Sequence, residues 1–534
     1  MLPIALAVSS APAAVRYVNV NNAGPSSPYI TWETAAINIQ DAVDVAVDGD
    51  EIAVTNGIYQ AGEKIWPPGL ETNRLAITKP LRVYSVNGSS VTVIDGGGAI
   101  RCVYLAADTT LTGFTLTNGF AIKGGGLYCE SNSAAVSDCV LTRNFVGGYG
   151  SPVGAVAAGA YGGTLTKCTL TLNTARISAG GGAAYATLNN CLLSTNYGSG
   201  AYQCTLNDCI LVGNSSGANF ADAGGGALQC TLNNCSLLNN YSYYGGGAAD
   251  CTLNDCSLKK NWADNHGGGA VGGTLNNCII TDNMSEYGGG ANGVILNNCT
   301  ISNNVATDFG GGTASCTVNN CLLIDNLAFG SIYTGFGGGD AWSTLNNCTL
   351  AGNEAGHGAG GGAFDATLNN CIVYFNTAPQ DPNYDSSCAL NYSCATPMPT
   401  NGVGNFTNEP SFVNLAIGNL RLQSNSPCIN AGNNDYVTTS TDLDGNPRIA
   451  GRAVDMGAFE FVLTPQLHPP ELNGDNCCVS FETACEWTYF IEYKNSLVDP
   501  VWNPYKAVVG DGNVFTITNC ISDAPQRFYR LRVN

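Results

Sequence analysis

Two histidines are the first candidates for chemistry, because imidazole ionises near neutral pH and binds metal ions. His266 and His357 each precede a Gly triplet, at equivalent points of an internal repeat. These points lie four repeats apart, and stacked strands would separate them by about 19 Å. That separation is too large for one metal ion or one transferred proton. We therefore predict no catalytic or metal-binding role for the pair.

The acidic and basic residues do not form a catalytic pattern either. Glycan hydrolysis needs paired carboxylates, but Asp208 and Asp255 stand where the repeat otherwise has Asn, so we predict that they cap a turn. Asp442–Asn446 begins like a Ca²⁺ loop and lacks the later ligands. Between residues 124 and 376 the basic residues have no acidic cluster beside them; they are Arg143, Lys167, Arg176, Lys259 and Lys260. We predict no catalytic residue, no metal site and no cofactor.

Aromatic residues gather in the segments that precede the Gly triplets, interleaved with Asp264, Glu286 and Asp308. Aromatic faces pack well on apolar surfaces, and carboxylates accept hydrogen bonds from hydroxyl groups, so the combination suits a sugar. We predict a glycan-binding surface formed by Tyr241, Tyr243, Tyr244, Trp262, His266, Tyr287 and Phe309. The alternative is that these side chains fold back on the protein and only cover it.

These residues are positioned by an internal repeat of about 22 residues. Eleven cysteines mark the repeat, and an Asn stands five residues after each of them. A Gly triplet ends nine residues before eight of the cysteines, as Gly245–Gly247 does before Cys256. The cysteines are Cys139, Cys168, Cys191, Cys209, Cys235, Cys256, Cys278, Cys299, Cys321, Cys348 and Cys371. Only the segment between the Asn and the next triplet varies in length, which is typical of a solenoid with its loops on one face.

The fixed part of the repeat predicts short strands. It has no apolar period of 3.6 residues, and Leu-x-x-Cys-x-Leu positions alternate on either side of an Asn-Asn pair. Asn tolerates the left-handed conformation of a tight corner, and its amide can bond the same Asn in the next coil. Parallel crossovers are almost always right-handed. We predict an all-β fold, a right-handed parallel β-helix (β-solenoid) of about 14–16 coils with a small C-terminal β-sandwich module.

Further cysteines suggest two arrangements. Four coils carry a second Cys five residues before the first, namely Cys204, Cys230, Cys251 and Cys316. We favour two interior columns of thiols, since buried Cys behaves as a small hydrophobe, over disulfides within or between coils. Near the C-terminus Cys477, Cys478, Cys485 and Cys520 lie outside the repeat and are better candidates for disulfides.

Charge and the N-terminal residues restrict the location and partners. The net charge of −20 disfavours nucleic acid and anionic membrane surfaces. Residues 1–14 fit a signal peptide, with an apolar run from Leu2 to Val8 and an Ala11-Pro12-Ala13 cleavage site. No later segment is long and apolar enough to span a bilayer. We expect an extracellular or cell-surface protein.

The chain is expected to have five parts. A signal peptide at residues 1–14 precedes an N-terminal cap helix and first irregular coils at 15–117, where 34–47 has helical spacing. Regular β-helix repeats follow at 118–378, the C-terminal end of the β-helix at 379–462, and the β-sandwich module at 466–534. Strands are expected near 51–54, 81–85, 91–94, 110–116, 488–494, 506–509, 514–518 and 528–533.

Several motifs resemble known families. The Gly-Gly-Gly-Ala and Leu/Ile-x-x-Asn signatures across about residues 118–376 resemble the repeats of polymorphic outer-membrane proteins and other secreted pectin-lyase-like β-helices. Residues 379–461 resemble the C-terminal segment of choice-of-anchor Q proteins, a class of bacterial surface β-helices, through Asp442–Arg448 and Asp455–Gly457. The last module resembles secreted modules that end in F-Y-R-[LV]-R. The resemblances imply a bacterial cell-envelope or extracellular location and imply no activity.

We therefore predict a non-catalytic, adhesive or structural β-helix whose partner is an extracellular glycan or another cell-envelope component. One alternative is a carbohydrate-active enzyme of the pectin-lyase-like superfamily, either a polysaccharide lyase or a glycoside hydrolase. Another is a self-assembling fibre subunit.

Overall fold

The computed structural model shows short strands that stack in parallel rows to form a β-helix. It describes residues 13–67, 71–147, 156–175, 180–217, 224–330, 334–462, 467–474, 476–483, 487–511, 513–520 and 526–533. The solenoid has about 12 turns, against the 14–16 coils predicted, and almost no helix. The predicted all-β, right-handed parallel β-helix is confirmed. Of the predicted signal peptide, residues 1–12 lie outside the described residues.

The chain divides into two compact units. Unit 1 comprises residues 1–295 and 301–316, and unit 2 comprises residues 296–300 and 317–534. Within the described ranges, no helix has the length and apolar character needed to cross a membrane.

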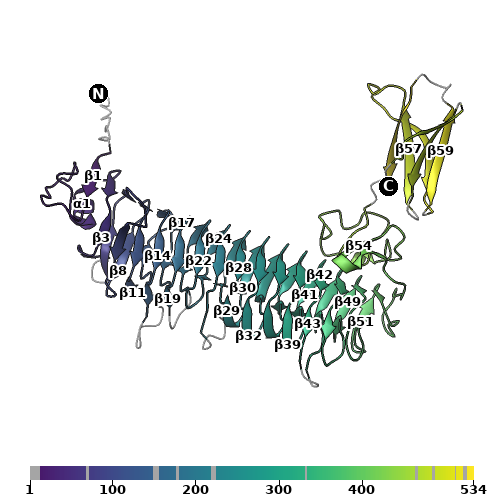
Figure 1. Cartoon of the computed structure of the whole chain (residues 1–534), viewed down its shortest axis with the longest axis horizontal. Helices are drawn as coiled ribbons and strands as arrows, with labels where there is room; N and C mark the ends of the chain where they lie inside the picture. Colours follow the sequence, from purple (N-terminus) through teal and green to yellow (C-terminus); the bar gives the residue numbers. More distant parts are fainter. Residues whose placement is uncertain are drawn as a thin grey trace, which may run out of the picture. The chain divides into compact units, whose positions relative to one another are not determined.

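The coil around Cys235 in unit 1 shows how the repeat folds. Its strands are β26 (Ala227–Leu228) and β27 (Thr231–Asn233) in a first sheet, β28 (Ser236–Leu238) in a second and β29 (Tyr241–Tyr244) in a third. One residue with positive φ separates each pair of strands: Gln229 (51°), Asn234 (53°) and Asn239 (53°). Equivalent strands of other coils pair in register, so that β14 (Val140–Thr142), β22 (Leu192–Ser194) and β28 belong to one row (Figure 1).

The cysteines form two columns inside the solenoid. The backbone N–H of Cys209 donates to Sγ of Cys235 at 3.4 Å, and that of Cys235 donates to Sγ of Cys256 at 3.3 Å. In the second column the N–H of Cys204 donates to Sγ of Cys230 at 3.3 Å. These five cysteines are buried free thiols. The predicted thiol columns are confirmed for them, because each sulfur accepts a backbone hydrogen bond from the adjacent coil.

Asparagine side chains form two further ladders. At the corner between the first and second sheets, Asn233 Nδ2 donates to Asn207 Oδ1 at 2.9 Å. Five residues after each Cys, the second ladder is buried: Asn240 is 1% exposed, and its Nδ2 donates to Leu211 O at 2.9 Å and to Asn261 Oδ1 at 3.0 Å. The predicted bonding between the same Asn of neighbouring coils is present in both ladders.

The N-terminal helix is shorter than predicted. α1 (Ile39–Val45) begins at Asn38, whose side chain accepts a hydrogen bond from the backbone N of Asp41 at 2.9 Å. Before Asn38, Thr34 lies in a turn and Ala36 pairs with Val18 in a β-bridge. The prediction of a helix over residues 34–47 was therefore wrong at both ends.

The first coils confirm some strands and divide another. β2 (Glu51–Val54) has the predicted bounds, β6 (Arg82–Ser85) begins one residue later than predicted, and β7 (Thr92–Asp95) is shifted by one residue at both ends. The strand expected over 110–116 is two strands, β9 (Thr110–Thr112) and β10 (Thr115–Thr117). Gly113, with φ of 79°, turns the chain between them.

In unit 2 a C-terminal segment covers the coils. We call residues 433–461 the covering segment. Three corner amides donate to its backbone carbonyls: Asn320 to Thr441 O (3.1 Å), Asn347 to Tyr436 O (2.9 Å) and Asn370 to Asn433 O (2.9 Å). The second-sheet residues Leu322, Thr349 and Ile372 of unit 2 are consequently 8%, 1% and 1% exposed.

The last residues of unit 2 form two antiparallel sheets around their own core of Phe481, Tyr489 and Ile491. The strands are β55 (Glu471–Asn473), β56 (Asn476–Glu482), β59 (Val514–Cys520), β57 (Thr488–Lys494), β58 (Asn503–Val509) and β60 (Phe528–Val533). Cys477 and Cys478 are free thiols, against the disulfides suggested for this module. They are consecutive in β56, so their side chains point to opposite faces. Cys485 lies outside the described residues.

Candidate functional site

The predicted glycan-binding residues lie on strands of the third sheet in unit 1. These strands are β29, β32 (Trp262–His266), β35 (Met284–Tyr287) and β39 (Val305–Phe309), paired in parallel. The second residue of each strand is small and buried, namely Ser242, Ala263, Ser285 and Ala306. Alternation of large exposed and small buried residues is the pattern of a strand with one face on the core. The expectation that these segments are loops was therefore wrong.

The first residues of these strands form an exposed row, with Tyr241 paired to Trp262 and Trp262 to Met284. Trp262 is 53% exposed, and its ring lies edge-on to Tyr241 with the ring centroids 5.9 Å apart. The hydroxyl of Tyr241 donates to Asp264 Oδ2 at 2.6 Å. This hydrogen bond to the carboxylate raises the pKa of Tyr241 to about 12, so the phenol remains a donor at neutral pH.

A second aromatic row runs beside the Gly triplets. Tyr244, His266, Tyr287 and Phe309 pair in register along the four strands. Their ring centroids are 5.5, 5.0 and 5.9 Å apart in that order, and the last pair is stacked at 4°. Tyr243 lies edge-on to Tyr244 at 4.7 Å. All five side chains are half-buried.

His266 is held between two aromatic rings. Tyr244 and Tyr287 both meet its imidazole in edge-to-face geometry. Its Nδ1 is buried and has no hydrogen-bond partner among the described residues. The imidazole therefore contributes to the packing of this row through its ring.

Carboxylates accompany both rows. Asn265 Nδ2 donates to Glu286 Oε2 at 2.7 Å, and burial together with the charges of Glu286 and Asp308 raises the pKa of Tyr287. The four strands contain no Lys or Arg. The nearest basic residues in sequence precede Trp262: Lys259 ends a second-sheet strand and pairs with Asp282 at 3.6 Å, and Lys260 stands in the turn. The strands thus present hydrogen-bond acceptors and aromatic rings without a cation that would attract an acidic sugar.

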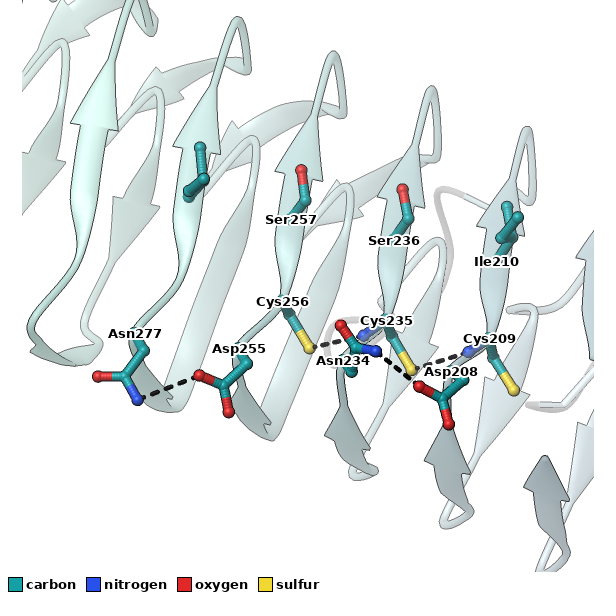
Figure 2. Close-up of a pocket in the computed structure, with 11 residues that line it drawn as sticks. Asp208, Cys209, Ile210, Asn234, Cys235, Ser236, Asp255, Cys256, Ser257 and Asn277 are labelled. Carbon is teal, nitrogen blue, oxygen red and sulfur yellow. Dashed lines mark hydrogen bonds between the residues drawn. The ribbon is translucent and has the colours of Figure 1, made fainter. Parts of the chain in front are cut away.

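The other candidates for chemistry have structural partners. Figure 2 shows the corner groove of unit 1, a shallow cavity of about 390 Å³ that contains Asp208 and Asp255. Asp208 Oδ1 accepts from Asn234 Nδ2 at 2.6 Å, and Asp255 Oδ1 accepts from Asn277 Nδ2 at 3.2 Å. Both aspartates have φ of 54°, the conformation of the corner. Their predicted place in the turn is confirmed, and their carboxylates bond the Asn side chain of the next coil.

In unit 2 the Ca²⁺-like segment is also a turn. Asp442 Oδ1 accepts from the backbone N of Asp444 at 3.0 Å and of Asn446 at 2.7 Å. His357 lies edge-on to Phe329 with centroids 6.4 Å apart.

A column of tyrosines on the first sheet was missed in the sequence. Tyr104, Tyr128 and Tyr161 pair in register, with ring centroids 5.6 and 4.9 Å apart and nearly parallel planes. Tyr185 and Tyr202 continue the column with tilted rings. The available signal was a Tyr near the end of each Gly-rich stretch, as in Gly-Gly-Leu-Tyr. The rings of Tyr104, Tyr128 and Tyr161 stack on one another, so the faces between them are already occupied.

The strand pairing and the seven predicted residues define a parallel β-helix with an aromatic, acidic face on its third sheet. No protein-family model and no curated protein matches the sequence. The chain is similar to pectate lyase Pel9A (13% identity, TM-score 0.25, covering 84% of this chain and 96% of that one). It is also similar to a tailspike protein mutant of E. coli bacteriophage HK620 in complex with a pentasaccharide (12% identity, TM-score 0.27, covering 94% of this chain and 91% of that one). A third similar structure is that of a PL6 family polysaccharide lyase from Pseudopedobacter saltans (12% identity, TM-score 0.23, covering 80% of this chain and 99% of that one). Sequence identities and TM-scores this low say nothing about the activity of this protein.

Proposed function

We propose that the protein is a non-catalytic, extracellular or cell-surface β-helix that binds a glycan of its surroundings through the third sheet of unit 1. The observation that carries the proposal is the exposed Trp262 indole. It lies beside Tyr241, whose hydroxyl is fixed on Asp264 at 2.6 Å. An aromatic face with adjacent fixed polar groups binds the apolar face of a sugar and its hydroxyl groups together.

The structure supports a rigid site. The four strands are paired through their backbones, and their small second residues are buried in the interior. The side chains therefore need little ordering on binding, which reduces the entropic cost of association. A surface role for the protein also accords with the resemblance of residues 379–461 to bacterial surface β-helices.

A glycan array with the full chain tests binding, followed by titration of the bound glycan against Trp262→Ala. We expect the substitution to weaken binding by about tenfold or more, since stacked aromatics carry much of the energy of such contacts. Ile279→Ala is the matched control, because Ile279 has the same 53% exposure and lies on the second sheet, away from the aromatic rows. Equal loss for both variants, or no bound glycan, would contradict the proposal.

A product assay on the same glycans separates binding from catalysis. Incubation of the protein with each bound polysaccharide should release neither reducing ends nor unsaturated sugars. Sustained release would instead favour the polysaccharide lyase or glycoside hydrolase alternative.

A further inference from the structure

The exposed row on the third sheet is longer than the predicted site. In unit 1 each of the eight ladder asparagines from Asn144 to Asn304 is followed by a residue of this row, and backbone pairing connects these residues from coil to coil. The pairs are Phe120 with Phe145, Phe145 with Thr174, Thr174 with Tyr197, Tyr197 with Ser215, and Ser215 with Tyr241. Beyond Tyr241 the row continues through Trp262 and Met284 to Val305. We call these nine residues the outer row; all belong to unit 1.

Six members of the outer row present a large side chain to solvent. Their exposed fractions are similar: Phe120 40%, Phe145 40%, Tyr197 40%, Tyr241 37%, Trp262 53% and Met284 39%. Exposed large apolar residues at one strand position in coil after coil are unusual on a soluble surface, where such residues are normally scattered. With strands spaced about 4.8 Å apart, eight steps extend the row over about 38 Å.

We propose that the outer row binds a linear polysaccharide along its length, with the sugar chain parallel to the solenoid axis. This inference rests on the proposed glycan-binding function and extends it. The row is longer than one or two sugar units, and its aromatic members stand at intervals of one or two coils. Each ring contacts one apolar sugar face, and linked contacts add through effective concentration.

The charges near the row restrict the class of polysaccharide. Asp264, Glu286 and Asp308 lie on the strands around Trp262. These strands contain no Lys or Arg. Of the two lysines before Trp262, Lys259 is paired with Asp282 and Lys260 stands in the turn, so the acidic side chains of this end outnumber its basic ones. Arg143 precedes the Phe145 end of the row. The acidic end repels a polyanion, so the polymer that fits the whole row is one of neutral or amino sugars.

Chain-length dependence tests the inference. Linear β-linked oligomers of N-acetylglucosamine, glucose and xylose, each with two, four and eight sugars, are titrated into the full chain by calorimetry. Oligogalacturonate of the same lengths serves as the acidic probe. For at least one neutral series we expect the affinity to rise by about tenfold or more from tetramer to octamer.

Two variants locate the bound chain. Tyr197→Ala should weaken the octamer by about fivefold or more and leave the tetramer bound near Trp262 unchanged, whereas Trp262→Ala should weaken both. The melting temperature of each variant is measured as a control, and a value equal to that of the wild type shows that the fold is intact.

The outcomes separate this inference from the proposed function. Neutral binding without length dependence, no effect of Tyr197→Ala on the octamer, or preference for oligogalacturonate would overturn the extended row. Any glycan binding that needs Trp262 would still stand. If neither these probes nor an array glycan binds, the proposed function fails as well.

Discussion

Asn240 shows what a single side chain contributes to the interior of unit 1. Its amide donates to Leu211 O and Asn261 Oδ1, and its Oδ1 accepts from the backbone N of Asn214 at 3.0 Å and from Asn214 Nδ2 at 3.1 Å. All four hydrogen bonds are buried. A buried polar group that loses its partner costs more than the hydrogen bond itself contributes. Each Asn of this ladder therefore stabilises its own coil and both neighbours.

Asn240→Ala should lower the free energy of unfolding by about 2–4 kcal/mol, because it leaves donors and acceptors of two neighbouring coils without partners. Urea denaturation followed by circular dichroism measures the change. Thr231→Ala is the control: Thr231 lies in β27 of the same coil with its side chain exposed, so its loss should change stability by less than about 1 kcal/mol. Equal changes in the free energy of unfolding for the two variants would contradict a particular contribution of the interior Asn ladder to stability.

The thiol columns predict a pH dependence. Hydrogen bonding with the neighbouring Cys191 thiol, together with burial, raises the pKa of Cys209 to about 12. A thiol in an unfolded chain has a pKa of about 8.5, so the unfolded state loses its proton first as pH rises. This contribution to stability should be complete below about pH 8.5 and decline from there toward pH 12. Urea denaturation at a series of pH values measures the decline.

Thiol labelling checks the same residues. Iodoacetamide at pH 8 should leave Cys209 unmodified in the native protein and label it after unfolding, because the thiolate is the nucleophile. Cys477 and Cys478 are partly exposed and serve as internal controls. Rapid native labelling of Cys209 would contradict its place in the interior column.

At the residue scale, the sequence predicted the positions of side chains in the coil better than their hydrogen-bond partners. The recurrence of Cys and Asn identified the interior and corner columns, since a side chain repeated in every coil must meet its own copy. The hydrogen bond between Tyr241 and Asp264 could not be predicted, because it joins adjacent coils across a segment of variable length.

The Gly triplets make the close turn between the third and first sheets. A Cβ on Gly268 would lie 2.4 Å from Met284 O and 2.5 Å from Gly289 O, both backbone atoms of the next coil. Gly293 has positive φ (64°) and no atom within 4 Å of such a Cβ. Gly268→Ala should lower the melting temperature strongly or prevent folding, whereas Gly293→Ala should cost only about 1 kcal/mol of left-handed strain. Calorimetric melting of both variants tests the distinction, which fails if Gly268→Ala is the milder change.

The covering segment contains a buried ion pair. Arg448 Nη1 donates to Glu460 Oε1 at 2.9 Å, and both side chains are 1% exposed. Arg448→Met would leave a buried carboxylate without its partner, at a cost of about 3–5 kcal/mol. We expect residues 433–461 to become sensitive to limited proteolysis in this variant.

Arg421→Gln is the control for the covering segment. The pair of Arg421 with Asp444 is exposed (49% and 29%) and should contribute less than about 1 kcal/mol. Proteolysis that is equal in both variants, or unchanged in Arg448→Met, would contradict the role of the buried pair.

At the element scale, strands with strict alternation were predictable and the third sheet was not. β57 and β60 have the predicted bounds because aromatic and β-branched residues fill them. β29 and β32 follow turn residues and contain Asp, Asn and Ser, which usually indicate loops. Pairing with neighbouring coils outweighs those local preferences.

At the scale of the whole molecule, a solenoid contacts itself mainly between adjacent coils, so its stability is close to a sum over coils and their interfaces. Deletion of residues 257–278 in unit 1 removes one complete coil and joins Cys256 to Ile279, which reproduces the Cys–Ile junction at Cys278–Ile279. We expect this variant to fold with the wild-type circular dichroism per residue and a melting temperature within a few degrees of wild type, while glycan binding through Trp262 is lost. Deletion of residues 257–267 removes only half a coil, including its second-sheet strand (Ser257–Lys259) and β32, and joins Cys256 at the corner after the first-sheet strand directly to Gly268. That variant should be insoluble or unfolded, because the strands and side-chain columns on the two sides of the deletion no longer align in register. If the two deletions behave alike, the coil is not the unit of stability in this protein.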